Sequence, residues 1–291
     1  MNKVDVEKFL VKPNTKLNLS KLSTSHSGGI ESKEGSKSIL EENIKKMIEL
    51  QSKLYAQDKY SVLIIFQAMD AAGKDSMIKH VMSGLNPQGT QVFSFKQPSK
   101  EELDHTYLWR INKALPEKGR IGIFNRSHYE EVLVVRVHDL VKSEKIPDKF
   151  KNKGIWKQRY RQINDFEKCL YENGIIIIKF FLHISKEEQK KRFLERIDDP
   201  SKNWKFSLDD IEERKFWNEY MKAYEDAIST TSRKHAPWYV IPADKKWFAR
   251  LAVSEIILKE IKKHKPGYPE MSEEQSEQLN QAKEILMNES I

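Results

Sequence analysis

Short apolar runs alternate with amphipathic segments along most of the chain, and this alternation predicts its secondary structure. Five apolar runs are typical of buried strands, at residues 60–66, 91–95, 120–124, 174–184 and 238–242. Segments with helical spacing follow them, at residues 74–83, 99–115, directly after 124, 186–197 and 245–263, and a further helix is predicted at 38–57. Strands that alternate with helices favour a parallel sheet. We therefore predict an α/β fold of three layers, in which helices cover both faces of the sheet.

The two ends of the chain depart from this pattern. Residues 1–37 are polar, rich in serine and lysine, and without clear periodicity. We expect them to form a poorly ordered, flexible tail that drapes over the body. Residues 38–265 form the predicted main domain. Residues 266–291 form a C-terminal tail that is expected to end in a loose helix.

Composition narrows the class of protein without selecting one. A formal charge of +8 and a pI of about 9.2 indicate an anionic partner, which could be nucleic acid, a membrane surface or a polyanionic substrate. One cysteine, Cys169, allows no intramolecular disulfide and suits a reducing compartment. We see neither a signal peptide pattern nor an apolar run of 18 residues, so we expect a soluble, cytoplasmic protein with no membrane partner. Zinc-site spacings and a serine-hydrolase elbow are also absent from the sequence.

A glycine–lysine turn follows the first predicted strand and precedes a helix, which is the context of a phosphate-binding loop. Residues 66–76 read Phe-Gln-Ala-Met-Asp-Ala-Ala-Gly-Lys-Asp-Ser. In such a loop, backbone N–H groups surround phosphate oxygens and the lysine ammonium reaches the outer phosphates. The candidate phosphate-binding residues here are Ala71, Ala72, Gly73, Lys74, Asp75 and Ser76. The alternative is an ordinary strand-to-helix turn.

This loop departs from the usual G-x-x-x-x-G-K-[ST] pattern at two positions. Ala68 replaces the first glycine, and Asp75 replaces the hydroxyl residue that usually binds magnesium. Asp70 lies inside the loop, where bound phosphates would repel its carboxylate unless a cation intervened. A magnesium contact resolves that repulsion. The alternative role for Asp70 is the stabilisation of a turn.

Polar residues also follow the strand at residues 120–124. Ligands bind at the carboxyl ends of strands in open α/β sheets, and here the strand leads into Asn125 and Arg126. Arg126 could clamp a phosphate, and Glu130 or Glu131 could supply a carboxylate to magnesium. The alternative for the two glutamates is a solvated helix start, where the helix dipole favours acidic residues.

A basic helix and a proline-containing loop at residues 190–207 are typical of a mobile lid. Arg192 and Arg196 are four residues apart and share one helix face. A lid that closes on phosphates excludes water, whose attack on the donor is the competing reaction. The alternative is a solvated helix whose acidic residues pair with the arginines. A second basic run, at residues 149–161, is either a track for a polyanion or a charged face.

Together these segments resemble the type-2 polyphosphate kinases. The matching stretches are residues 69–75, 122–131, 196–207 and 235–244, which occur in the family's order, and the resemblance covers residues 38–265. It implies a thymidylate-kinase-like P-loop fold with a helical lid. It also implies reversible phosphate transfer from inorganic polyphosphate to nucleotides, with Mg²⁺ as cofactor and Mn²⁺ as a substitute.

The resemblance carries over to individual residues. Asp70 and Lys74 match the family's P-loop pair, Arg126 matches its second-strand arginine, and Arg192 and Arg196 lie where lid arginines are expected. Lys205, in the third matching stretch, is a candidate phosphate contact. Asn125 departs from members with aspartate at that position.

Asn125 instead resembles a subgroup that phosphorylates both nucleoside mono- and diphosphates. We therefore expect use of ADP and AMP, with guanine nucleotides as further substrates and with no nucleic-acid partner. Family members commonly form homo-oligomers, either dimers or tetramers. Two other classes stay open: an ATP-dependent nucleotide kinase on the same scaffold, and a non-catalytic polyanion-binding protein.

Overall fold

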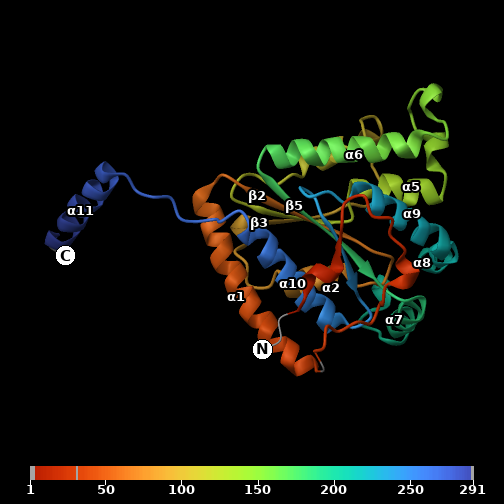
Figure 1. Ribbon diagram of the computed structural model, residues 1–291, viewed down its shortest axis with the longest axis horizontal. Helices are drawn as coiled ribbons and strands as arrows, with labels where there is room; N and C mark the ends of the chain where they lie inside the picture. Colours follow the sequence, from red (N-terminus) through yellow and green to blue (C-terminus); the bar gives the residue numbers. More distant parts are fainter. Residues whose placement is uncertain (1–3, 31, 290–291) are drawn as a thin grey trace.

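The computed structural model describes residues 4–30 and 32–289, and its centre is a six-stranded sheet (Figure 1). The strands are β1 (Leu10–Val11), β2 (Ser61–Gln67), β3 (Thr90–Ser94), β4 (Ile121–Asn125), β5 (Ile175–His183) and β6 (Trp238–Pro242). Their spatial order is β1-β6-β5-β2-β4-β3. All neighbours pair in parallel except β1, which is antiparallel to β6. The predicted parallel α/β sheet is therefore confirmed.

Helices cover both faces of this sheet (Figure 1). The α-helices of the described residues are α1 (Lys33–Gln57), α2 (Lys74–Val81), α3 (Lys100–Leu103), α4 (Trp109–Lys113), α5 (Val134–Val137), α6 (Ile155–Glu172), α7 (Lys186–Asp198), α8 (Leu208–Glu213), α9 (Trp217–Thr231), α10 (Lys246–Lys262) and α11 (Glu273–Asn288), of which α11 lies apart from the sheet. Helices α1, α2 and α10 pack together on one face, and α6 covers the other.

The central strands are buried on both sides because helices cover both faces. Every residue of β2 and of β5 is buried. Successive side chains along a strand point to opposite faces. Accordingly, Val62, Ile64 and Phe66 join the larger apolar cluster, whereas Leu63 and Ile65 join a smaller one that includes Leu170 of α6. This packing fixes the register of β2, whose carboxyl end carries the phosphate loop.

The helix expected at residues 99–115 is two short helices instead. Ser99 begins α3 with a reciprocal capping box to Glu102. The helix ends at Leu103, and the next helix, α4, begins only at Trp109. Between them, the His105 ring stacks on the Trp109 ring at a centroid distance of 4.1 Å. The two helices also differ in burial, since no residue of α3 is buried whereas Ile111 of α4 is.

The N-terminal segment corrects our expectation of a flexible tail. Val4, Val6, Phe9 and Val11 are buried in the larger apolar cluster, and Leu10 and Val11 form the edge strand β1. Further along, the backbone N–H of Leu19 donates to the Glu225 carboxylate at 2.7 Å. The segment is polar on average, yet most of its described apolar residues pack against the body, with Leu22 as an exposed exception. The average composition of this segment therefore did not reveal that it contributes a strand and core residues.

The C-terminal segment leaves the body and ends in α11 (Figure 1). None of the residues of α11 is buried, which agrees with the predicted tail and terminal helix. Within residues 4–30 and 32–289, no helix has the length and apolar character needed to cross a membrane.

Candidate active site

The loop between β2 and α2 has the geometry of an anion-binding turn. β2 ends at Gln67 and α2 begins at Lys74. Ala71 and Gly73 have positive φ angles of 58° and 104°, which turn the backbone tightly. Gly73 is the N-cap of α2 and has no side chain that could cap the helix. The backbone N–H groups of the first turn are therefore available to an anion, and the predicted phosphate contacts stay a prediction.

Lys74 is held inside this loop. Its Nζ donates to the carbonyl oxygens of Ala68 at 2.8 Å and Met69 at 3.4 Å. Burial lowers the pKa of the Lys74 ammonium, and the negative charge of Asp70 opposes that shift. The ammonium is thus placed where a phosphate on the loop amides would meet it.

Arg126 lies at the end of β4, next to the loop. Its backbone N–H donates to the Phe66 carbonyl at 3.0 Å, which joins the ends of β4 and β2. A left-handed backbone, with φ of 63°, turns the chain so that Nη2 reaches Asp70 Oδ1 at 2.9 Å. Burial acts to lower the pKa of Arg126, but the attraction of Glu130 and Asp70 raises it overall. Arg126 therefore carries a positive charge at the carboxyl end of β4, beside the phosphate loop.

The side chains of three predicted phosphate-binding residues have protein partners. Asn125 Nδ2 donates to Asp75 Oδ1 at 2.7 Å, which ties β4 to the first turn of α2. Ser76 Oγ accepts a hydrogen bond from Arg250 Nη2 at 2.8 Å. For Asp75, the group left to meet an anion is thus the backbone N–H, whereas Ser76 keeps its hydroxyl O–H as a donor besides its backbone N–H. Arg250 had no sequence signal, because it follows Ser76 by 174 residues.

The two neighbouring glutamates after β4 have different surroundings. Burial raises the pKa of Glu130, and the positive charges of Arg126 and Lys74 oppose that shift. Glu131 instead pairs with Arg159, which also pairs with Glu144. Burial raises the pKa of Glu131 to about 7 despite Arg159. Glu130 therefore belongs to the loop site, and Glu131 belongs to a separate ion cluster.

Arg159 likewise corrects one interpretation of the basic run at residues 149–161. Its side chain is buried, and its guanidinium bonds two carboxylates. It is therefore not part of a surface track for a polyanion.

Arg192 lies against the phosphate loop and not on the open side of a lid. It is buried, and its donors reach four backbone carbonyls and one carboxylate, those of Ala71, Ala72, Ala243, Asp244 and Glu188, at 2.7–3.2 Å. All of these bonds are internal to the protein. Arg192 therefore supports the loop in this structure, and its expected contact with the donor stays a prediction.

Arg196, one turn further along α7, has more freedom. Its Nη1 lies 3.3 Å from Asp210 Oδ2, and about a quarter of its side chain is exposed. Lys205 is exposed, with its ammonium 4.9 Å from the centre of the Trp204 ring. Arg196 thus has a carboxylate partner on α8, whereas Lys205 lies against the Trp204 ring.

Sequence reasoning missed two further residues beside the loop. Burial and then repulsion from Asp70 raise the pKa of Asp210 in α8. Gln189 Nε2 donates to the backbone carbonyl of Asp70 at 2.9 Å. Neither residue lies in a recognisable sequence motif. Each is separated from the loop by more than a hundred residues of chain, so local spacing could not indicate its position. The four-residue helical spacing of Gln189 and Phe193, both buried beside Arg192, was the available signal.

The carboxyl ends of β2 and β4 offer only a few protein ligands for a magnesium ion. Among residues 4–30 and 32–289, no group of three or more His, Cys, Asp or Glu side chains could hold a metal. Mg²⁺, however, keeps several waters and binds through one or two carboxylates together with substrate phosphates. Asp70 and Glu130, which both interact with Arg126, supply such a pair. The donor set therefore fits Mg²⁺ bound jointly with a phosphate substrate.

A parallel sheet, a glycine–lysine loop at its central strand and charged groups at the next strand end define a P-loop phosphotransferase. Comparisons with known proteins identify the family. A sequence model described as Polyphosphate kinase 2 (PPK2) matches residues 30–269. The chain belongs to this family and is a polyphosphate kinase, an enzyme of a family that generally uses a divalent metal.

Individual relatives match along nearly the whole chain. The ADP-polyphosphate phosphotransferase of Rhodopseudomonas palustris is 50% identical over 98% of this chain and 99% of its own. The AMP/ADP-polyphosphate phosphotransferase of Meiothermus ruber is 42% identical over 91% of this chain and 96% of its own. The crystal structure of polyphosphate kinase 2 from Arthrobacter aurescens superposes with a TM-score of 0.88, at 38% identity and 97% coverage of both chains.

Proposed function

We propose that this enzyme transfers the terminal phosphate of inorganic polyphosphate to both ADP and AMP, reversibly and with Mg²⁺. One observation supports this proposal most directly. At the adjoining ends of β2 and β4, four charged residues come together: Asp70, Lys74, Arg126 and Glu130. Two cations and two carboxylates at one P-loop suit a reaction in which every substrate is a phosphate anion.

The chemistry requires alignment and charge neutralisation more than proton transfer. The acceptor oxygen belongs to a nucleotide phosphate that is already anionic near pH 7, so no strong general base is needed. Loop N–H groups and Lys74 hold phosphates at the reaction centre, and Arg126 stabilises negative charge on the transferred group. When bound, Mg²⁺ neutralises phosphate charge. Asp70 and Glu130 hold the ion, and Arg196 binds the donor chain.

The dual use of acceptors rests on Asn125. Its amide donates to Asp75 beside the first turn of α2. An aspartate at position 125 would bring a second carboxylate to within hydrogen-bonding distance of Asp75, and the two would repel each other. The relatives differ in their names, one for ADP alone and one for AMP and ADP. Guanine nucleotides as acceptors and a homo-oligomeric state are further expectations of this proposal.

Nucleotide formation from AMP and from ADP tests the proposal, each with long-chain polyphosphate and Mg²⁺ and with a control that lacks polyphosphate. We expect ATP from ADP, and both ADP and ATP from AMP. Product from ADP alone would overturn the interpretation of Asn125. Transfer from ATP but none from polyphosphate would indicate an ATP-dependent nucleotide kinase. An Asn125→Asp variant should lower the ratio of AMP to ADP turnover.

A further inference from the structure

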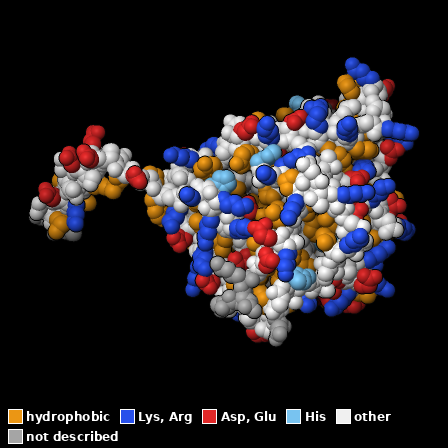
Figure 2. Space-filling view, in the orientation of Figure 1, with side chains coloured by type: hydrophobic (Ala, Val, Ile, Leu, Met, Phe, Trp, Pro, Cys, Tyr) orange, Lys and Arg blue, Asp and Glu red, His pale blue; other side chains and the backbone are white. Residues whose placement is uncertain are grey.

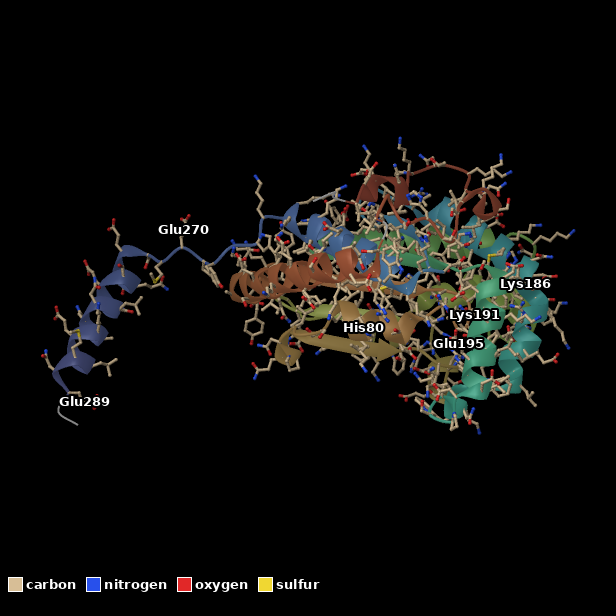
Figure 3. All side chains as sticks on the ribbon, turned by 90° about the horizontal axis from the view of Figure 1, so that it is seen from below. His80, Lys186, Lys191, Glu195, Glu270 and Glu289 are labelled. Carbon is tan, nitrogen blue, oxygen red and sulfur yellow. The ribbon has the colours of Figure 1, made fainter. Side chains whose placement is uncertain are left out.

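The C-terminal segment, residues 266–289, is an arm that stands away from the body in two perpendicular views (Figures 1 and 3). A linker with two prolines and a glycine, at residues 266–269, leads into α11. Ser272 and Gln275 start this helix with a reciprocal capping box. The helix therefore has a defined beginning, yet none of its residues is buried.

Such a helix is not expected to persist alone in water. Nucleation of a helix is costly, and isolated helices of about 12–15 residues are marginal even with favourable sequences. α11 has 16 residues and exposes Leu279, Ile285, Leu286 and Met287, each by more than half of its surface. The conformation of the arm thus indicates a surface that covers it.

The exposed apolar residues are arranged for docking. Leu279, Ala282 and Leu286 follow one another at intervals of three and four residues, and Ile285 flanks them, so they share one face of the helix. Glu273, Glu277 and Glu284 lie on the opposite face. This pattern is that of a helix that lays its apolar side into a groove.

Charge indicates which kind of surface the apolar face of α11 contacts. Residues 266–291 contain six glutamates and one lysine, so they carry −5 while the rest of the chain carries +13. Figure 2 shows acidic and hydrophobic side chains on the arm and many Lys and Arg side chains on the body. An anionic membrane would repel this arm, since membrane-bound amphipathic helices place Lys and Arg on their polar face. A cationic body surface attracts it.

We infer that the arm docks onto the body of a second copy of this chain, and that two copies exchange arms reciprocally. A two-fold arrangement lets each arm meet the same cationic body surface, so one contact closes the assembly. The arm leaves the body at the end opposite α7 (Figure 1), and none of the residues assigned to catalysis belongs to it. Assembly through α11 is therefore independent of the residues assigned to catalysis.

Paired substitutions in the full chain test this inference. Leu279→Glu with Leu286→Glu places charge on the apolar face. Gln281→Glu with Asn288→Glu adds the same charge, with the same seven-residue spacing, on the opposite side of the helix. Sedimentation equilibrium over a range of protein concentrations measures association. We expect dimers or larger assemblies in the wild type and the control pair. The apolar-face pair should dissociate at protein concentrations at least about tenfold higher than the control does, because docking would bury its new charges.

Three outcomes would overturn the inference. The wild-type chain could be monomeric at all concentrations, or the apolar-face pair could associate as tightly as the control. In the third, a monomeric chain would bind vesicles of phosphatidylserine and phosphatidylcholine through Leu279 and Leu286. Nucleotide turnover, measured per subunit on the same samples, is expected to be equal in all three proteins. Loss of turnover in every sample would count against the proposed function and leave the assembly result standing.

Discussion

The phosphate loop and the lid hold their charged side chains in different ways. At the loop, Lys74 bonds two carbonyls and Arg126 bonds Asp70, all within the framework of β2 and β4. On the lid, Arg196 has one partner at 3.3 Å, and Lys205 is exposed. The reacting phosphates need one fixed geometry, whereas a donor chain of varying length needs adaptable contacts. The difference suggests that chemistry belongs to the loop and donor capture to the lid.

Arg192 joins the two regions. It belongs to α7, the helix that also carries Arg196, but its guanidinium bonds the loop carbonyls of Ala71 and Ala72. Gln189, one turn earlier, bonds the carbonyl of Asp70. The first half of α7 therefore supports the phosphate loop. The side chains that are free to adjust to a donor chain begin at Arg196.

The largest effect is expected at the loop. Lys74→Ala should lower kcat by about 10²–10³-fold, because it removes a preorganised positive charge from the reaction centre. Lys79→Ala, on the exposed side of the same helix, serves as the control and should leave kcat unchanged. Steady-state ATP formation from ADP measures both variants. A Lys74→Ala enzyme within tenfold of the wild type would place the chemistry elsewhere.

Arg192→Met tests the hydrogen bonds by which α7 supports the phosphate loop. Removing the guanidinium leaves three buried carbonyls and one partly buried carbonyl without their donor, so the free energy of unfolding should fall by about 2–4 kcal/mol. Activity should fall as well, because the loop loses its support. Urea unfolding measures the first effect, with Lys191→Met on the exposed face of α7 as the control (Figure 3). Unchanged stability together with a raised KM for polyphosphate would return Arg192 to the donor site.

Glu130 and Glu131 sharpen the boundary of the loop region. Glu130→Gln should raise the Mg²⁺ concentration for half-maximal activity about tenfold, because it removes one of two carboxylates that fit the ion. Glu131→Gln is the adjacent control and should leave the response to Mg²⁺ unaltered, since Glu131 pairs with Arg159. Magnesium titrations of activity compare the two. Equal shifts in both variants would contradict the separation of the two glutamates.

The smallest effect is expected on the lid. Arg196→Gln should raise the KM for polyphosphate by about three- to tenfold with little change in kcat, because a partly exposed charge contributes modestly to binding. Higher ionic strength should reduce the difference from the wild type. Lys190→Gln, exposed on the same helix, is the control. A fall in kcat comparable with that of Lys74→Ala would remove the distinction between loop and lid.

The sequence predicted best what depends on local pattern. The buried runs became β2, β4, β5 and β6, because long apolar stretches leave little choice but a covered sheet. The phosphate loop was predicted for a similar reason: the strand, the glycine–lysine turn and the helix follow one another directly. For the same reason, Arg126 at the end of its strand was expected near the loop.

Contacts between distant segments could not be predicted in this way. The shared face of Arg192 and Arg196 was a sound expectation, but nothing local shows that the loop covers the first of them 120 residues away. Glu130 and Glu131 are neighbours whose side chains leave the chain in different directions, so spacing alone could not assign either one. The edge strand β1 has only two residues, and its partner is β6.

The pairing of β1 with β6 has a consequence for protein synthesis. Leu10 pairs with Tyr239 and Val11 with Trp238, so among the described strands the first to be synthesised pairs with the last. At translation rates of about 5–20 residues per second, the wait lasts roughly 10–45 s. During that time Val4, Val6 and Phe9 have no core to enter, because the strand beside them does not yet exist. Residues 4–11 are therefore expected to complete their folding only after β6 has been synthesised, and to expose their apolar side chains until then.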